Sequence, residues 1–185
     1  MVDYLRLISK HTQGEHEQTV PALIIHSALV TKKALDIAND YLKRHPEKQL
    51  DLRLLEEMGM LHDIGIFQTD TPVLFTKGEG PYITHLSKGA KILEAENLPL
   101  HANAARTHST ITQEQIRSEE LPLPAGEYVP QTPEEEILSL ADKFYNKRFE
   151  GLFSERSVAE VREYLAQYSD DSVRHFDVVF AKYCE

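Results

Sequence analysis

The feature that most limits the fold of this chain is a long apolar stripe at helical spacing in residues 22–44. Apolar side chains three or four positions apart lie on one face of an α-helix, so the segment predicts an amphipathic helix packed on a core. The stripe comprises Ala22, Leu23, Leu29, Val30, Ala34, Ile37, Ala38 and Tyr41. The sequence contains no strand–helix alternation, hairpin signal or internal repeat. We therefore expect an all-α protein.

Start and stop signals predict further helices along the chain. Asp51 is suited to cap a helix, and Gly65 to stop the same helix. Thr132 followed by Pro133 is a strong helix start, with Glu135 in position to complete a capping box. Helices are expected at roughly 52–62, 86–96, 100–108, 132–147, 157–168 and 171–183, with irregular connections at 66–83 and 109–131. These two connections, the second with room for a short helix, are expected to shape a pocket.

The bulk properties restrict the class of protein. The 185 residues suffice for one domain with a sizeable core. A net charge of -10 argues against a protein that coats nucleic acid, but not against a nucleotide substrate, because a bound dication would invert the local field. The single cysteine, Cys184, permits no internal disulfide and fits a reducing compartment. Without a leader segment or an apolar run near about 18 residues, we expect a soluble, cytoplasmic protein with no membrane partner.

Several histidines and aspartates lie within apolar stretches, where a polar side chain needs a partner. His62-Asp63-Ile64-Gly65 closes the apolar segment that ends the expected second helix. His26 has apolar residues one turn before and one turn after it, and Asp142 lies between Leu138 and Tyr145. Aspartate is almost never fully buried unless it is paired or binds a metal. His26, His62, Asp63 and Asp142 are therefore candidate metal ligands, and a set of buried, hydrogen-bonded polar groups is the alternative.

Two more histidines are candidates to join this set. His85 opens an expected helix in which Gly89, four residues on, leaves room for close approach. His108 ends the short alanine-rich helix, and His101 falls on nearly the same helical face. The two lie about 10 Å apart along that helix, so one ion with bonds of about 2 Å can hardly take both. We favour His108 and expect His101 at a rim or exposed.

Ligands of mixed type indicate the metal and the chemistry. Imidazole together with carboxylate suits iron, manganese, nickel, cobalt or zinc better than it suits magnesium. Four to six ligands shared between two ions, with one bridging carboxylate, describe a two-metal hydrolytic centre. In such a centre a metal-bound hydroxide attacks phosphorus.

This ordered set of residues resembles the HD superfamily of metal-dependent phosphohydrolases. His62-Asp63-Ile64-Gly65 matches the variant that names its HDIG subgroup, and Leu140-Ala141-Asp142-Lys143 is similar to the final aspartate segment of the family. Residues 82–90 are similar to an insertion motif of members with two metals. The resemblance spans about 22–147. It implies a helical bundle forming one domain over 1–185, with C-terminal helices in 154–183 packed on the core.

The resemblance also implies roles for individual residues. A first ion would be held by His26, His62, Asp63 and Asp142, and a second by Asp63, His85 and His108, with His62 and Asp63 at the catalytic centre. Many HDIG members carry a lysine where this chain has Ile66. Lys88, Arg106 and Lys143 are candidates to replace its contact with substrate phosphate. The GYP motif of the cyclic-dinucleotide phosphodiesterases is absent, which weakens an assignment to cyclic di-GMP.

The leading hypothesis is hydrolysis of a phosphoester or phosphoanhydride bond in a nucleotide-like small molecule, using one or two divalent transition-metal ions. A di-iron oxygenase of the same superfamily is one alternative, and a catalytically silent regulator that binds nucleotide or metal is another. The sequence leaves open the substrate, the native metal, the number of ions and whether the chain forms a homo-oligomer.

Overall fold

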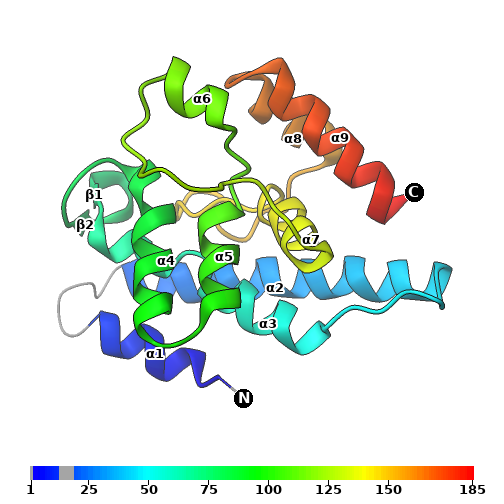
Figure 1. Ribbon diagram of the computed structural model, residues 1–185, viewed down its shortest axis with the longest axis horizontal. Helices are drawn as coiled ribbons and strands as arrows, with labels where there is room; N and C mark the ends of the chain where they lie inside the picture. Colours follow the sequence, from blue (N-terminus) through cyan, green and yellow to red (C-terminus); the bar gives the residue numbers. More distant parts are fainter. Residues whose placement is uncertain (1, 13–18) are drawn as a thin grey trace.

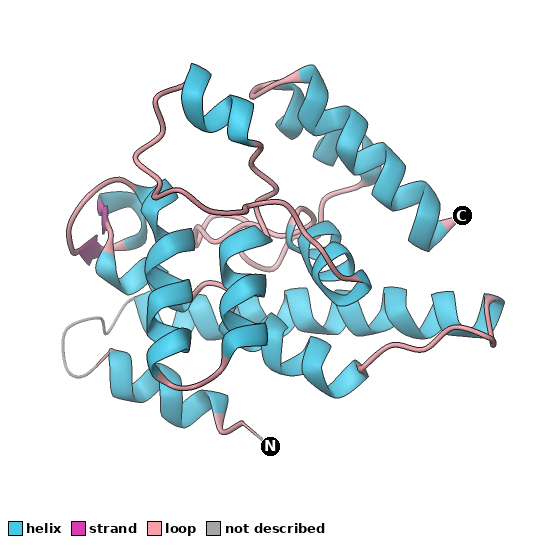
Figure 2. Cartoon of the chain, in the orientation of Figure 1, coloured by secondary structure: helices cyan, strands magenta, loops and turns pink. Residues whose placement is uncertain are grey.

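The computed structural model describes residues 2–12 and 19–185, in which helices make up nearly all of the regular structure (Figure 2). This confirms the all-α expectation. The helices are α1 (Tyr4–His11), α2 (Thr19–Arg44), α3 (Leu52–Leu61), α4 (His85–Ala95), α5 (Pro99–Thr107), α6 (Gln113–Ser118), α7 (Pro133–Asp142), α8 (Val158–Ala166) and α9 (Asp170–Cys184). Helix α1 was not expected from the sequence, and α6 is the short helix for which 109–131 left room. No helix in these described ranges has the length and apolar character needed to cross a bilayer.

The long helix α2 organises the core (Figure 1). It packs against α3, α7 and α9, and its predicted stripe contributes Val30, Ala34 and Ala38 to the main apolar cluster. A second cluster joins α4 and α5, which lie side by side, to the 3₁₀ helix η1 (Ile64–Gln68). The end of α3 lies between the two clusters. That position places His62 and Asp63 between the α2–α7 side and the α4–α5 side of the molecule.

The connection 66–83 is more regular than expected. After η1 it forms η2 (Pro72–Leu74) and η3 (Tyr82–Thr84), and β1 (Asp70–Thr71) pairs antiparallel with β2 (Thr76–Lys77). The sequence carries no hairpin signal in this connection. Strands of two residues are too short to show an alternating pattern, and the turn between them uses Phe75 in the left-handed region (φ 58°) where a glycine would be the usual signal.

Helix α7 begins as predicted and ends earlier. The Thr132 side chain accepts a hydrogen bond from the backbone N–H of Glu135. The expected return bond of the capping box is not formed, because the Glu135 carboxylate accepts from the backbone of Gln131 and from Thr107. The helix stops at Asp142, five residues before the expected end at Lys147. The chain then turns, and this turn decides where Lys147 lies.

Candidate metal centre

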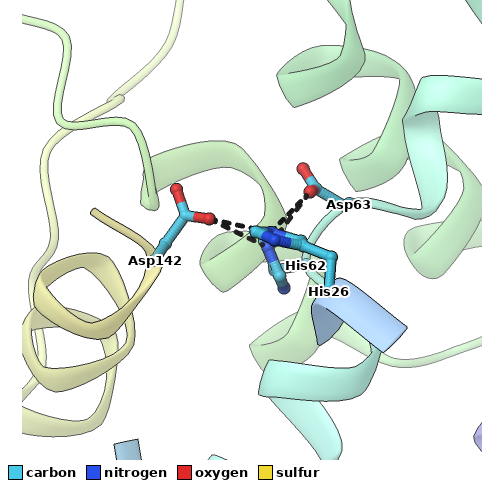
Figure 3. Close-up of side chains that lie close together, drawn as sticks. All are labelled: His26, His62, Asp63 and Asp142. Carbon is cyan, nitrogen blue, oxygen red and sulfur yellow. Dashed lines mark hydrogen bonds and ion pairs between the residues drawn. The ribbon is translucent and has the colours of Figure 1, made fainter. Parts of the chain in front are cut away.

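Four buried side chains from three helices converge on one point (Figure 3). His26 lies on α2, His62 caps α3, Asp63 follows it and Asp142 ends α7. His26 Nε2 lies 3.1 Å from Asp142 Oδ1 and 3.4 Å from Asp63 Oδ2. His62 Nε2 lies 3.2 Å from Asp63 Oδ2 and 3.5 Å from Asp142 Oδ1. These four residues, which offer ligand atoms within 4.8 Å of one another, are called the first group.

A second group shares Asp63. His85, the first residue of α4, and His108, the C-cap of α5, face the other oxygen of this carboxylate. His85 Nε2 lies 3.4 Å and His108 Nε2 lies 3.3 Å from Asp63 Oδ1, and the two nitrogens are 3.2 Å apart. Asp63 therefore directs one oxygen to each group. This is the arrangement of a bridging carboxylate.

Backbone carbonyls orient three of the histidines in the same way. Nδ1 of His62 lies 2.7 Å from the carbonyl of Gly59, that of His85 2.6 Å from Tyr82, and that of His108 2.9 Å from Ala105. Each Nδ1–H donates to the backbone carbonyl three positions earlier, so each Nε2 points inward as the ring nitrogen that can bind a metal ion. Such outer contacts are the usual means of fixing a metal-binding imidazole.

The residues present fit a metal ion in each group. Among the described residues, His62 Nε2 and both oxygens of Asp63 are buried without a hydrogen-bond partner, although they lie within ion-pair distance of one another. Buried polar atoms are nearly always satisfied, and a shared cation would satisfy these. Imidazole nitrogen and carboxylate oxygen are donors that favour a divalent transition metal.

The histidines of the site differ in pKa. Burial lowers the pKa of His62, but the carboxylates of Asp63 and Asp142 outweigh burial and raise it to about 9. Burial dominates at His85 and lowers its pKa to about 3, and burial also lowers the pKa of His108. Burial would raise the pKa of both aspartates, but the neighbouring positive charges hold it well below the ordinary range. Both carboxylates are thus ionised and ready to bind cations.

One cation at the site, Lys147, was not expected from the sequence. Lys147 Nζ lies 3.1 Å from Asp63 Oδ2 and 3.2 Å from Asp142 Oδ1. In a helix that continued to Lys147, this side chain would point roughly 140° away from Asp142. The early end of α7 instead returns it to the carboxylates. Because the helix was expected to continue to Lys147, this residue was not placed at the site. No spacing in the sequence indicates its contact with the aspartates.

Of the three residues predicted to contact phosphate, only Lys143 lies beside the site. Lys88 Nζ donates to the backbone carbonyls of Gln68 and Glu79, and Arg106 pairs with Glu94 at 2.5 Å, so the structure does not bring these two to the site. Lys143 lies beside the site and donates to the carbonyl of His108 at 2.9 Å.

Two other positions that the sequence singles out, His101 and Ile66, are both buried. His101 is buried rather than exposed, and it bonds to Glu57 at 3.1 Å, outside both groups. Ile66 is buried in the second apolar cluster, so its side chain is part of the core.

A cavity of about 600 Å³ adjoins Asp142. Both long connections line it, as expected, through residues such as Tyr82 and Ile111. Its cationic residues are Lys143, Lys147, Arg148 and Arg156, and its tyrosines are Tyr82, Tyr145, Tyr164 and Tyr168. An acidic protein thus presents a locally basic, aromatic cavity beside its buried carboxylates.

The fold and the site define a class: an all-α domain in which histidines and aspartates from successive helices form a candidate two-ion centre. The HD domain family model matches residues 23–147, more than half of the chain, and the protein belongs to the HD domain family. Its fold is similar to that of the HD domain of the phosphodiesterase PgpH from L. monocytogenes, with a TM-score of 0.54 and 18% identity over 98% of this chain and 88% of that one. Family membership supports, in general terms, a metal-dependent phosphohydrolase.

Proposed function

We propose that this protein hydrolyses a phosphoester or phosphoanhydride bond in a nucleotide-like small molecule. The observation that carries the proposal is the pair of ligand groups sharing Asp63 and opening beside a cavity that contains both cations and tyrosines. The first group would hold one ion and the second group another. Divalent ions held there would supply a hydroxide nucleophile from water and neutralise charge on the phosphoryl oxygens.

The chain's own residues would bind and orient the substrate. Phosphate is attracted by the cationic cavity wall, which offsets the repulsion expected from a net charge of -10. The exposed ring of Tyr168 offers a face on which a base can stack. Burial of His62, Asp63 and Asp142 keeps the reacting end of the cavity in a low-dielectric setting, where charge–charge interactions are strong.

The test is a panel assay with the purified protein loaded with manganese, iron, nickel or cobalt. We expect release of phosphate or nucleoside product from some members of a broad nucleotide panel. Asp63→Asn, which keeps the shape of the side chain and removes the bridging charge, should lower turnover by about a hundredfold or more, since charge stabilisation by metal is worth several kcal/mol.

The other outcomes separate the competing functions. Absence of product across the panel from fully loaded protein would contradict the proposal. Substrate-dependent oxygen uptake by a mixed-valence iron form would favour the oxygenase. Tight nucleotide binding without turnover would favour the regulator.

A further inference from the structure

Lys147 occupies a distinctive place among the cations of the cavity. Its Nζ contacts Asp63 Oδ2 and Asp142 Oδ1, the same two oxygens toward which the histidines of the first group converge. Within the described part of the chain, it is the one lysine or arginine that pairs with either aspartate. Its side chain is 17% exposed and lines the cavity. The ammonium group therefore lies where the cavity meets the first group.

The other three cations of the cavity are placed differently. Lys143 donates a hydrogen bond to the carbonyl of His108. Arg156 donates to the carbonyls of Lys143 and Tyr145 and covers the ring of Tyr164 at 4.7 Å. Arg148 is exposed. Of the four, Lys147 alone directs its charge at the carboxylates of the first group.

Charge balance shows what this ammonium would do once the site is loaded. Asp63 and Asp142 carry two negative charges, which two divalent ions more than neutralise. The carboxylates would then be neutralised by the metal ions instead of by Lys147. The reacting end of the cavity would become strongly positive. A desolvated ammonium group with no anionic partner is costly, so the group should attract an anion that enters the cavity.

We propose that Lys147 is a substrate-contacting residue, which binds a phosphoryl oxygen beside the first group. This inference rests on the proposed function, because it names the residue that recognises the phosphate which that function requires. Lys147 would thus make the phosphate contact that Lys88 and Arg106 do not make, because these two side chains are paired with other groups. A lysine suits this role as a compact point charge with three donors.

The test measures binding of inorganic phosphate to manganese-loaded protein by isothermal titration calorimetry, after free metal has been removed. Lys147→Gln should raise the Kd for phosphate by about tenfold or more, while elemental analysis finds the same manganese content as in the wild type. Lys32→Gln is the matched control. Lys32 also pairs with an aspartate, Asp36 at 2.5 Å, but on the exposed surface of α2, and its loss should leave both values unchanged.

A chemical rescue keeps the test independent of whether Lys147→Gln folds. Lys147→Cys is made in a Cys184→Ser background, since Cys184 is the only native cysteine. Alkylation with 2-bromoethylamine forms a carbon–sulfur bond, expels bromide and restores an ammonium group at the end of the side chain. Phosphate affinity should be low before alkylation and should return afterwards, with unchanged manganese content.

The two proposals fail in different ways. Equal phosphate affinity in wild type and Lys147→Gln, or no phosphate binding by the wild type, would overturn the role of Lys147 even if nucleotides are hydrolysed. Loss of manganese from Lys147→Gln would also overturn it, because Lys147 would then act by maintaining the ligand groups. If no nucleotide is hydrolysed but phosphate affinity depends on Lys147, the proposed function fails and the role of Lys147 stands.

Discussion

The protonation of single histidines should determine how the candidate site takes up metal. In the metal-free protein His62 has a pKa of about 9, because two carboxylates outweigh its burial, so it carries a second proton at neutral pH. A metal ligand must be the neutral imidazole. Binding of the first ion should therefore release about one proton, and its apparent affinity should rise about tenfold per pH unit, levelling off above about pH 9. Calorimetric titration of manganese at pH 7, in buffers of different ionisation enthalpy, measures that proton directly.

His85 provides the internal comparison for this prediction. Burial lowers its pKa to about 3, so this ring is already neutral at pH 7 and carries no second proton to release. The second ion should accordingly bind without proton release from His85. Metal uptake with no net proton release at pH 7, and an affinity that does not change with pH, would contradict the assignment.

Individual site residues were predictable where their neighbours were apolar. His26 and Asp142 stand out in the sequence because a charged or polar group in an apolar stripe needs a buried partner, and the structure brings both to the same point. The metal-binding roles remain predictions. Lys147 was not predictable, because its contact depends on five residues that leave the helix after Asp142. The position of a chain turn at a helix end is set by tertiary packing rather than by local pattern.

At the scale of elements, α4 packs closely on η1 and carries His85, which lies 3.4 Å from Asp63. A Cβ at Gly65 would overlap the carbonyl oxygen of His85 and the backbone nitrogen of Gly89. Gly65→Ala should therefore push α4 away from Asp63 and destabilise the metal-free protein by roughly 1–3 kcal/mol, the usual cost of overpacking. Because α4 carries His85, the second ion should also bind more weakly. Urea unfolding measures the first effect, and manganese titration followed by EPR measures the second.

Gly126→Ala is the matched control for this change. A Cβ at Gly126 would make only ordinary contacts, 3.6 Å from Tyr128 and 3.9 Å from Arg106. It should alter stability by less than about 0.5 kcal/mol and leave manganese binding intact. Equal effects of the two substitutions would show that α4 is not held by contact at Gly65.

The elements themselves were predictable to the extent that local chemistry determines them. Asp51 caps α3 through the backbone N–H of Leu54, as its residue type indicates. Most of the stripe in 22–44 lies on the buried face of α2, while Leu29 and Tyr41 at its margin are partly exposed. The pairing of β1 with β2 was not predictable, because strands of two residues are too short to show an alternating apolar pattern. Their pairing depends on the turns around them.

At the scale of the whole molecule, the segment matched by the family and the cavity wall do not coincide. The family match ends at residue 147, whereas Arg156, Tyr164, Tyr168 and Ser172 also line the cavity. These residues belong to α8, α9 and the segments before each of them, and α9 packs on α2 and α7. The two candidate ligand groups lie in the matched segment. If the proposed function holds, we expect the C-terminal helices to contact the part of the substrate that is not phosphate.

Tyr168 gives the sharpest test of this division. The centre of its ring lies 5.3 Å from that of Tyr164, and its hydroxyl donates a hydrogen bond to the Tyr164 hydroxyl at 3.1 Å. The residue is 65% exposed and lines the cavity. Base–aromatic stacking is worth about 1–3 kcal/mol, so Tyr168→Ala should raise KM for the best nucleotide by about tenfold and leave kcat and the Kd for inorganic phosphate unchanged. Phe153→Ala removes another exposed ring, outside the cavity lining, and should change none of these values. A fall in kcat at unchanged KM would place Tyr168 with the reacting groups instead, and the C-terminal helices would then belong to the catalytic centre.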